Sequence, residues 1–414
     1  MRRIYYGWYV VAIATVIYTL MVGATFSAFA LYVLPVSAEF GLSRADMNTA
    51  MILMNLGNAG LAPFIGRLLD RAPVKRVMLA CALLMGLSFV VLSLSRSLWL
   101  SAAVLAVGLP TAYLGAGTLT MTVLLARWFT VQRGRAIALA ALGMSLGSVT
   151  VTPLVGYLIE ADGWRTALLI SGGLVTAVLL AISLMLREQP GPGDVEPGAA
   201  VAPVGAHPAA PPTPAPVGAI LRSAQFWSIS LGAAMALAVG QALAITLTPL
   251  AIGGGLTTAQ GASLISVMGG GSIAGGLLLA VIADKVDRIS LLAVLFLLAG
   301  LLNAALLADH SYALLVGCAA LLGVALGMAT PAFYALLADR FGPASFGTVR
   351  GLTMPVIAAF GMVSIRLAGE VFDRTGSYDL LFSAFIVACV AAAGLIFLTR
   401  FASAAIPGEA RAPA

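Results

Sequence analysis

The stretch GRLLDRAPVKR, residues 66–76, separates two long apolar runs and decides how the chain folds. The runs on either side, about residues 46–69 and 75–95, are each long enough to cross a bilayer as an α-helix. Between them, Asp70 and its basic neighbours are close in sequence to Pro73, a residue type that interrupts helices. The stretch is therefore expected to be a short charged turn that joins two membrane-spanning helices.

Apolar runs of this length recur along almost the whole chain. We place twelve spans, in two sets of six, at about residues 8–34, 46–69, 75–95, 99–126, 135–159, 165–186, 225–250, 260–283, 289–308, 312–338, 350–372 and 379–400. The expected fold is an all-α membrane protein, with twelve transmembrane helices in two pseudo-symmetric six-helix bundles.

The composition excludes a water-soluble protein. Hydrophobic residues make up 61% of the chain and charged residues only 9%, whereas a soluble domain has roughly a quarter charged residues. The net charge of +6 comes from basic residues scattered through short loops, so nucleic acid is not an expected partner. The first apolar run, from about Trp8 to Leu34, is too long for a signal peptide and is expected to be the first helix.

The two sets of spans are separated by a segment of different composition, residues 187–224. It holds nine of the 20 prolines, interleaved with Ala and Gly, which predicts a solvated linker. Its one histidine, His207, is interpreted as incidental. The expected organisation is a first bundle over residues 1–186, this cytoplasmic linker over 187–224, a second bundle over 225–400 and a cytoplasmic tail over 401–414.

Basic residues predict the orientation in the membrane, because Lys and Arg accumulate on the cytoplasmic side. With both termini inside, 17 of the 22 Lys and Arg residues fall on the cytoplasmic side and four on the other, and only Arg366 falls within a span. We therefore expect a multi-pass protein of the cell inner (plasma) membrane with both termini in the cytoplasm.

The two halves of the chain carry matching marks. The turn at residues 66–76 has a counterpart after the eighth span, where Asp284, Lys285 and Arg288 again place an acid and bases at a helix end. The ends of the fifth and eleventh spans also correspond, at residues 156–165 and 369–378. Such marks indicate two six-helix repeats, an arrangement known in secondary transporters.

The charged turn, with Gly66, Asp70, Arg71, Lys75 and Arg76 at these spacings, resembles the signature between helices two and three of the major facilitator superfamily. The resemblance covers essentially the whole chain apart from the linker and the tail. It implies a secondary transporter and says almost nothing about the substrate.

Finer features resemble the branch of that superfamily that contains monocarboxylate transporters and oxalate:formate antiporters. They are Tyr6-Gly7-Trp8, the run from Glu39 to Arg44, Arg127-Trp128-Phe129 with Arg133-Gly134, and Asp373 with Thr375-Gly376-Ser377-Tyr378. Carboxylate carriers of that branch usually have Gly-Arg in helix eight, where this chain has Gly275-Gly276. The resemblance lets Arg366 correspond to a cation known in helix eleven of the oxalate-exchanging relatives.

Arg366 is the first candidate for substrate binding. An arginine inside a span is costly unless it faces protein, water or an anion, and a guanidinium can hold a carboxylate through two parallel hydrogen bonds. Two other interpretations stay open, namely an ion pair with Glu370 at i+4 and extension of the side chain to the membrane surface. Glu370 is also the candidate for proton coupling.

Four other polar side chains within spans are weaker candidates for substrate binding. A hydroxyl or amide in a low-dielectric setting needs a hydrogen-bond partner, and a bound carboxylate could supply one. Bonding to a neighbouring helix is an equal alternative. These residues are Tyr18, Tyr113, Gln241 and Tyr334.

The residues of the two turn motifs are expected to form a conformational latch at the cytoplasmic rim, with plain solvation of the charges as the alternative. They are Gly66, Asp70, Arg71, Lys75 and Arg76 in the first half, and Asp284, Lys285 and Arg288 in the second.

Together these observations favour a secondary active transporter of a small organic anion, a mono- or dicarboxylate, working by alternating access with proton symport. The alternatives are an efflux transporter of lipophilic or cationic compounds and a membrane receptor that moves nothing. No Ser/His/Asp or Cys/His arrangement is evident in the sequence, so we expect no enzyme, no cofactor and no metal. The expected partners are the anionic substrate and membrane lipids, with the chain working as a monomer.

Overall fold

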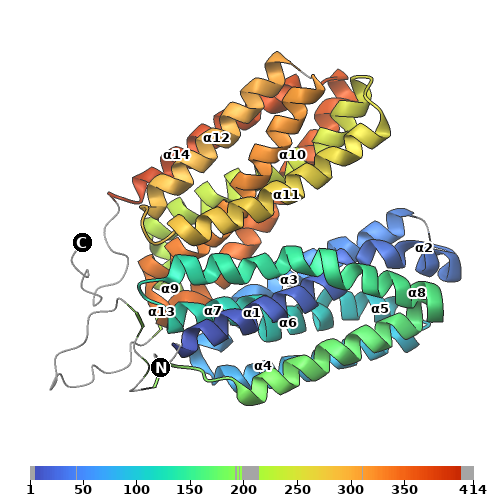
Figure 1. Ribbon diagram of the computed structural model, residues 1–414, viewed down its shortest axis with the longest axis vertical. Helices are drawn as coiled ribbons and strands as arrows, with labels where there is room; N and C mark the ends of the chain where they lie inside the picture. Colours follow the sequence, from blue (N-terminus) through green and yellow to red (C-terminus); the bar gives the residue numbers. More distant parts are fainter. Residues whose placement is uncertain are drawn as a thin grey trace. The chain divides into compact units, whose positions relative to one another are not determined.

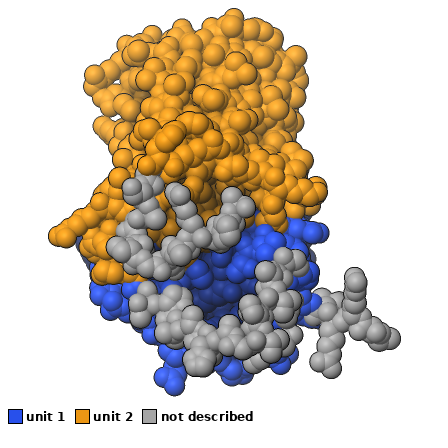
Figure 2. Space-filling model, turned by 90° about the vertical axis from the view of Figure 1, so that its left-hand side faces the viewer, with its two compact units in different colours: residues 1–214, 343–354 blue, residues 215–342, 355–414 orange. Residues whose placement is uncertain are grey.

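The computed structural model describes residues 5–42, 44–191, 194, 196–197, 214–309 and 311–401. Within these residues, all regular structure is helical. The chain divides into two compact units (Figure 2). Unit 1 comprises residues 1–214 and 343–354, and unit 2 comprises residues 215–342 and 355–414.

Unit 1 is built from long apolar helices (Figure 1). The longest of them, α8, packs along both α1 and α4. The elements are α1 (Tyr6–Val22), η1 (Gly23–Ser27), α2 (Phe29–Phe40), α3 (Arg44–Arg71), α4 (Val74–Leu94), α5 (Leu98–Ala103), η2 (Val104–Gly108), α6 (Leu109–Tyr113), η3 (Leu114–Thr118), α7 (Leu119–Trp128) and α8 (Arg133–Met185).

Unit 2 repeats this design. Its α14 packs along α10 and α12, and an apolar core runs through the unit between them. The elements are α9 (Val217–Arg222), α10 (Ala224–Gly253), α11 (Thr258–Ile282), α12 (Arg288–Ala308), α13 (Tyr312–Thr375) and α14 (Asp379–Leu398). The part of α13 between residues 343 and 354 belongs to unit 1.

Two helices are far longer than a bilayer requires, and each is broken by one glycine. The 53-residue α8 breaks at Gly163, where φ is +81°, and the 64-residue α13 breaks at Gly342, where φ is +71°. A residue with a Cβ rarely adopts such angles, so glycine lets the chain change direction there without a loop. Ten described helices are long and apolar enough to cross a membrane, and dividing these two gives the predicted twelve spans.

These glycine breaks correct two predicted loops. The sequence analysis ends the fifth span at residue 159 and starts the eleventh at 350, whereas the helices run to Gly163 and restart at Pro343. The dipeptide Gly342-Pro343 is a strong local signal for such a boundary, because Gly ends helices and Pro is favoured at their first position. Arg350 therefore lies about two turns inside a helix and not at its cytoplasmic edge.

The first and fourth spans contain π-helical turns, which the sequence analysis did not anticipate. The first span is interrupted by η1 and the fourth by η2 and η3. Within η3, Gly117 leaves helical geometry altogether, with φ −126° and ψ −109°. Such wide turns free backbone groups from the regular helical pattern and are frequent at functional sites.

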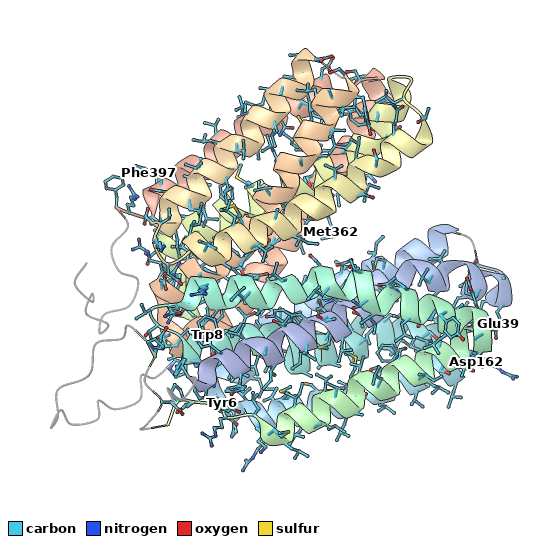
Figure 3. All side chains as sticks on the ribbon, in the orientation of Figure 1. Tyr6, Trp8, Glu39, Asp162, Met362 and Phe397 are labelled. Carbon is cyan, nitrogen blue, oxygen red and sulfur yellow. The ribbon has the colours of Figure 1, made fainter. Side chains whose placement is uncertain are left out.

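The two ends of unit 1 are distinguished by labelled residues in Figure 3. Tyr6 and Trp8 lie at one end, and Glu39 and Asp162 lie at the other. The sequence analysis assigns the first pair to the cytoplasmic side and the second pair to the opposite side. The helices of unit 1 thus extend from the predicted cytoplasmic side to the predicted opposite side.

The linker is described only in part. It contains the short helix α9 and, near its start, Asp194 and Glu196. His207, the stretch 198–213 and residues 402–414 of the tail lie outside the described residues. The expected boundaries of the linker and the tail remain predictions.

Candidate functional site

Arg366 lies in the part of α13 that belongs to unit 2, and 84% of its side chain is exposed. Its Nε lies 3.9 Å from Oε2 of Glu370, at the outer limit of an ion pair. Glu370 has a closer partner in Arg374, whose Nη2 donates to Oε1 of the carboxylate. One carboxylate is therefore shared between two guanidinium groups, and with Asp373 the segment from Arg366 to Arg374 carries two positive and two negative charges.

Gln241 lies beside the segment that carries Arg366. A Cβ placed on Gly361 would stand 2.7 Å from Oε1 of Gln241, and Ser364 donates to the carbonyl of Ala238 over 2.9 Å. These contacts join α10 to α13 two and five residues before Arg366. Tyr334, also in unit 2, is half-buried and packs against the ring of Phe333, with 5.4 Å between centroids.

A buried arginine that the sequence predicts at the cytoplasmic edge of the eleventh span lies in unit 1. Arg350 is only 1% exposed, and its Nη1 donates to the carbonyl of Thr118 and to the hydroxyl of Thr122, each over 2.6 Å. The hydroxyl of Tyr18 lies 2.8 Å from the Thr122 hydroxyl and 3.2 Å from the same carbonyl. The π-helical turn η3 ends at Thr118 and so places a backbone acceptor at the centre of this cluster.

This cluster corrects the statement that Arg366 is the only basic residue within a span. Arg350 is a second one, because the helix begins at Pro343 and not at residue 350. The same cluster gives Tyr18 a structural hydrogen-bonding role. Tyr113, in contrast, packs edge-to-face on Phe26 with 5.1 Å between ring centroids, so the two tyrosines have different surroundings.

Asp70, the acid of the charged turn, binds the start of the helix that follows Gly342. Its carboxylate accepts hydrogen bonds from the backbone N–H groups of Gly347, over 3.0 Å, and Thr348, over 2.6 Å. Carboxylates are favoured near helix N-termini because backbone N–H groups and the helix dipole both present positive charge there. That helix passes from unit 1 into unit 2 at Pro355.

Gly66 is needed for this contact. A Cβ on Gly66 would lie 2.0 Å from the carbonyl oxygen of Gly347, a separation that no side chain tolerates. A Cβ on Gly347 would in turn lie 2.6 Å from Oδ1 of Asp70. Two glycines thus let the backbones of α3 and the 343–354 segment touch, which explains why the motif requires glycine at its first position.

The remaining latch candidates have other partners. The Nζ of Lys75 donates to the carbonyl of Leu184, while Arg71 and Arg76 are exposed. In unit 2, Arg288 pairs with Asp284 over 3.5 Å and also with Asp339, and Lys285 is exposed. Asp284, the counterpart of Asp70 in the second half, therefore forms a side-chain ion pair in this structure.

Glu196, in the linker, is a functional candidate that the sequence analysis missed. Its carboxylate accepts hydrogen bonds from the backbone N–H groups of Thr130, Val131 and Gln132, over 2.7 to 3.1 Å, directly before α8 begins. Burial alone would raise the pKa of Glu196, but these hydrogen bonds and one from the Thr130 hydroxyl lower it below its usual value. The linker is thereby anchored to unit 1.

We expect Glu196→Gln to loosen this anchor, because the amide keeps only one acceptor oxygen and loses the charge. The pKa of Glu196 is lower in the folded protein than its usual 4.5, so the stabilisation is complete above that value and is lost as the pH falls through the folded pKa. Hydrogen exchange at residues 130–132, corrected for its intrinsic pH dependence, should be about tenfold faster in the variant at pH 7. Asp194→Asn, which alters only a local turn with Gly191, is the control and should leave this exchange unchanged.

The sequence matches the family described as Major Facilitator Superfamily over residues 11–357, most of the chain. The chain belongs to the Major Facilitator Superfamily. Members of this superfamily are membrane transporters of small molecules and are typically monomeric. The apolar helices of the described residues agree with a multi-pass membrane protein of this superfamily.

Two similar curated proteins fit the branch suggested by the sequence. The transporter is 26% identical to the oxalate:formate antiporter of Oxalobacter formigenes over 187 residues, which cover 44% of this chain and 42% of that protein. It is 28% identical to human monocarboxylate transporter 11 over 269 residues, which cover 62% of this chain and 54% of that protein. The chain spans about half the length of the curated relatives it matches.

A solved structure shows the same fold. The human organic anion transporter MFSD10 superposes with a TM-score of 0.71 over 94% of this chain and 99% of that one. The two sequences are only 15% identical, so this likeness concerns the major facilitator fold alone.

Proposed function

We propose that this transporter moves a small organic anion, a mono- or dicarboxylate, by alternating access coupled to proton symport. The observation that carries the proposal is the exposed guanidinium of Arg366 within a membrane-spanning helix. A charged side chain at such a position is rare and usually faces a water-filled path or a ligand. A carboxylate matches the guanidinium in charge and in its two-pronged geometry.

The surroundings of Arg366 favour ligand binding over simple charge pairing. Glu370 lies closer to Arg374 than to Arg366, so its carboxylate satisfies Arg366 only in part. Glu370 is shared by two arginines, and the guanidinium of Arg366, with 84% of the side chain exposed, remains accessible to a further anion. Gln241, beside the same helix, offers an amide N–H that could donate to the second end of a dicarboxylate.

Similar proteins support the class of substrate. The names of the curated relatives refer to oxalate, formate and monocarboxylates, and the solved structure is that of an organic anion transporter. All of these substrates are anions. For proton coupling, Glu370 is the candidate, because its carboxylate lies one turn from Arg366 in the same membrane-spanning helix.

The contacts of Asp70 indicate how the conformational latch would work. We propose that its carboxylate holds one conformation of the transport cycle by binding the start of the helix that continues into unit 2. Gly66 permits this approach, and Arg71, Lys75 and Arg76 flank it. Asp284, Lys285 and Arg288 are proposed to act at the corresponding place in the second half.

The orientation is also a proposal. The 17 basic residues assigned to one side favour a protein of the inner membrane with both termini in the cytoplasm. Tyr18, Tyr113 and Tyr334 remain weaker candidates for substrate contact, and the hydrogen bonds of Tyr18 to Thr122 favour a structural role for it.

A thermal-shift screen of the purified protein against mono- and dicarboxylates tests the proposed substrate class. A ligand at about 100 times its Kd stabilises the folded protein by about 2.7 kcal/mol, so a true substrate should raise Tm measurably. In Arg366→Lys, which keeps the charge but loses the fork, the same shift should need about tenfold more ligand. In the control Arg374→Lys it should be unchanged. A set of shifts produced only by lipophilic cations would refute the proposal and favour the efflux alternative.

A further inference from the structure

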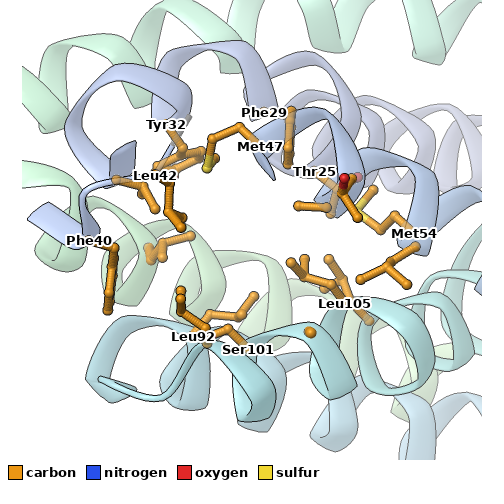
Figure 4. A pocket seen from close by; sticks show the side chains of 18 of the residues that line it. Thr25, Phe29, Tyr32, Phe40, Leu42, Met47, Met54, Leu92, Ser101 and Leu105 are labelled. Carbon is orange, nitrogen blue, oxygen red and sulfur yellow. The ribbon is translucent and has the colours of Figure 1, made fainter. Parts of the chain in front are cut away.

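Unit 1 encloses a cavity of about 490 Å³ that the proposed transport function does not use (Figure 4). Its wall includes Phe40 and Trp164, next to the end marked by Glu39 and Asp162 in Figure 3. Side chains from the first four spans and from the second half of α8 line it, and labelled examples are Phe29, Met54 and Leu105. The volume falls within the range of about 300–1,000 Å³ that is usual for ligand pockets.

The wall of this cavity is almost entirely apolar. None of its lining residues is charged, and four of them carry a hydroxyl group: Thr25, Tyr32, Thr49 and Ser101. The Thr25 hydroxyl donates to the carbonyl of Met21, and the Tyr32 hydroxyl is buried. A carboxylate would lose its hydration here without meeting a positive charge. The ligand that fits is a hydrocarbon chain.

Two of the helical segments that line the cavity are π-helical. η1 contributes Ala24 and Thr25, and η2 contributes Leu105. A π-turn widens the helix and displaces its side chains from regular spacing, which keeps the neighbouring helices from closing over the space. The cavity is thus a consequence of how the first and fourth spans are wound.

Charged side chains lie beside the residues that form the mouth of the cavity. Arg165 follows Trp164 and is held by Glu39, with Nη2 and Oε1 2.7 Å apart. The same carboxylate also accepts a hydrogen bond from the indole of Trp164 over 2.8 Å. Arg96 is exposed two residues before the lining residue Leu98 and acts electrostatically on Glu39. Glu39 pairs with Arg165, whereas Arg96 has no ion-pair partner among the described residues, so its guanidinium can bind an acidic head group; the acids Glu160 and Asp162 are exposed at the same end.

The outer surface beside the mouth of the cavity consists of exposed apolar side chains. Trp99 is 88% exposed, and Leu98 and Leu100 are about half exposed. In a membrane-spanning protein such side chains contact lipid, and tryptophan is typical of the level where acyl chains meet head groups. The molecule available at that place, with a hydrocarbon chain and an acidic head, is a membrane phospholipid.

We propose that this cavity holds one acyl chain of an anionic phospholipid, with the phosphate beside Arg96 and the second chain along the exposed face at Trp99. The site lies within unit 1 and is independent of the substrate proposed above. It requires no charge inside the cavity and uses the positive charge at its mouth.

Photo-cross-linking of the full-length protein in nanodiscs tests the proposal. A phosphatidylglycerol with a photoreactive group in the middle of one acyl chain is the probe, and peptide mass spectrometry locates the adducts. We expect adducts at lining residues such as Leu53 and Leu105. Adducts confined to outward-facing residues such as Leu87, which is 58% exposed, would overturn it.

Two adjacent alanines in α5 provide a matched pair of variants. Ala102 lines the cavity, whereas Ala103 is exposed and does not. Ala102→Trp should reduce labelling of Leu53 and Leu105 by about tenfold, because the indole occupies the space of the chain. Ala103→Trp should leave it unchanged. Should Ala102→Trp not be monodisperse, Ala102→Leu gives a smaller loss in the same direction, and unchanged labelling in a folded Ala102 variant contradicts the proposal.

Further probes test which head group is bound and whether the acyl chain comes from a phospholipid or from a free fatty acid. Phosphatidylglycerol should label the cavity more than phosphatidylcholine with the same photoreactive chain, and Arg96→Gln should remove that preference. The control is Arg67→Gln, which changes an exposed arginine near the other end of α3 and should leave the preference for phosphatidylglycerol intact. Equal labelling by both lipids in the wild type would contradict the proposal that Arg96 binds the acidic head group. Labelling by a photoreactive free fatty acid but not by either phospholipid would overturn the phospholipid assignment.

Discussion

Replacing Arg366 with alanine is expected to abolish uptake of a carboxylate substrate. The guanidinium is 84% exposed in a membrane-spanning helix, and Glu370 at 3.9 Å satisfies it only in part. Hydrogen bonds to charged groups contribute about 1.5–3 kcal/mol each, so loss of a bidentate contact should weaken binding by about 100-fold or more. The measurement is initial uptake by proteoliposomes of the carboxylate identified in the thermal-shift screen.

Arg374→Ala is the matched control for this experiment. Arg374 also pairs with Glu370 at i,i+4 spacing and is 75% exposed, so its loss makes the same local change in charge about two turns further along α13. Uptake should fall by no more than about twofold, because an exposed ion pair contributes little. Equal losses in both variants would mean that uptake responds only to the total charge of this helix.

The double variant Arg366→Ala with Glu370→Ala separates ligand binding from charge pairing. If Arg366 serves only to neutralise Glu370, removing both groups takes away one positive and one negative charge and should restore uptake. If Arg366 binds the carboxylate, the double variant stays inactive. Restored uptake by a folded double variant would refute the ligand assignment.

Asp70→Asn is expected to slow turnover by about tenfold or more while leaving the Kd for the substrate within about twofold of the wild type. The Asp70 carboxylate binds two backbone N–H groups at the start of the helix after Gly342, over 3.0 and 2.6 Å. Removing its charge weakens two hydrogen bonds to a charged group, which contribute about 1.5–3 kcal/mol each, and it shifts the equilibrium between conformations without touching the substrate. Equilibrium binding and initial uptake rates should be measured on the same preparations.

Asp284→Asn is the comparison for this variant, because it changes the same residue type at the corresponding place in the second half. Asp284 pairs with Arg288 over 3.5 Å through side chains. Its neutralisation should therefore have the smaller effect on turnover. A large loss of affinity with a normal maximal rate in Asp70→Asn would remove the latch interpretation.

Much of the candidate site depends on contacts that local sequence does not encode. Asp70 and its partner Gly347 are 277 residues apart, and Glu196 lies 66 residues from the Thr130 amide that it binds. The apolar run around Arg350 begins late, which puts this residue at the cytoplasmic edge of the predicted eleventh span, although Gly342-Pro343 marks the earlier start. Contacts between distant segments arise only when helices pack, so no periodicity in either segment could have predicted them.

The sequence by itself determined the number of spans, the two-fold repeat and the superfamily, because a bilayer requires about twenty apolar residues per helix and the charged turns carry a specific motif. Only the tertiary structure decided that Arg350 is buried, that Glu370 lies closer to Arg374 than to Arg366, and that a cavity opens beside Trp99. These helices are apolar on nearly every side, so the sequence does not indicate which face turns inward. That choice is made by packing against neighbouring helices, and it determines which polar side chains meet.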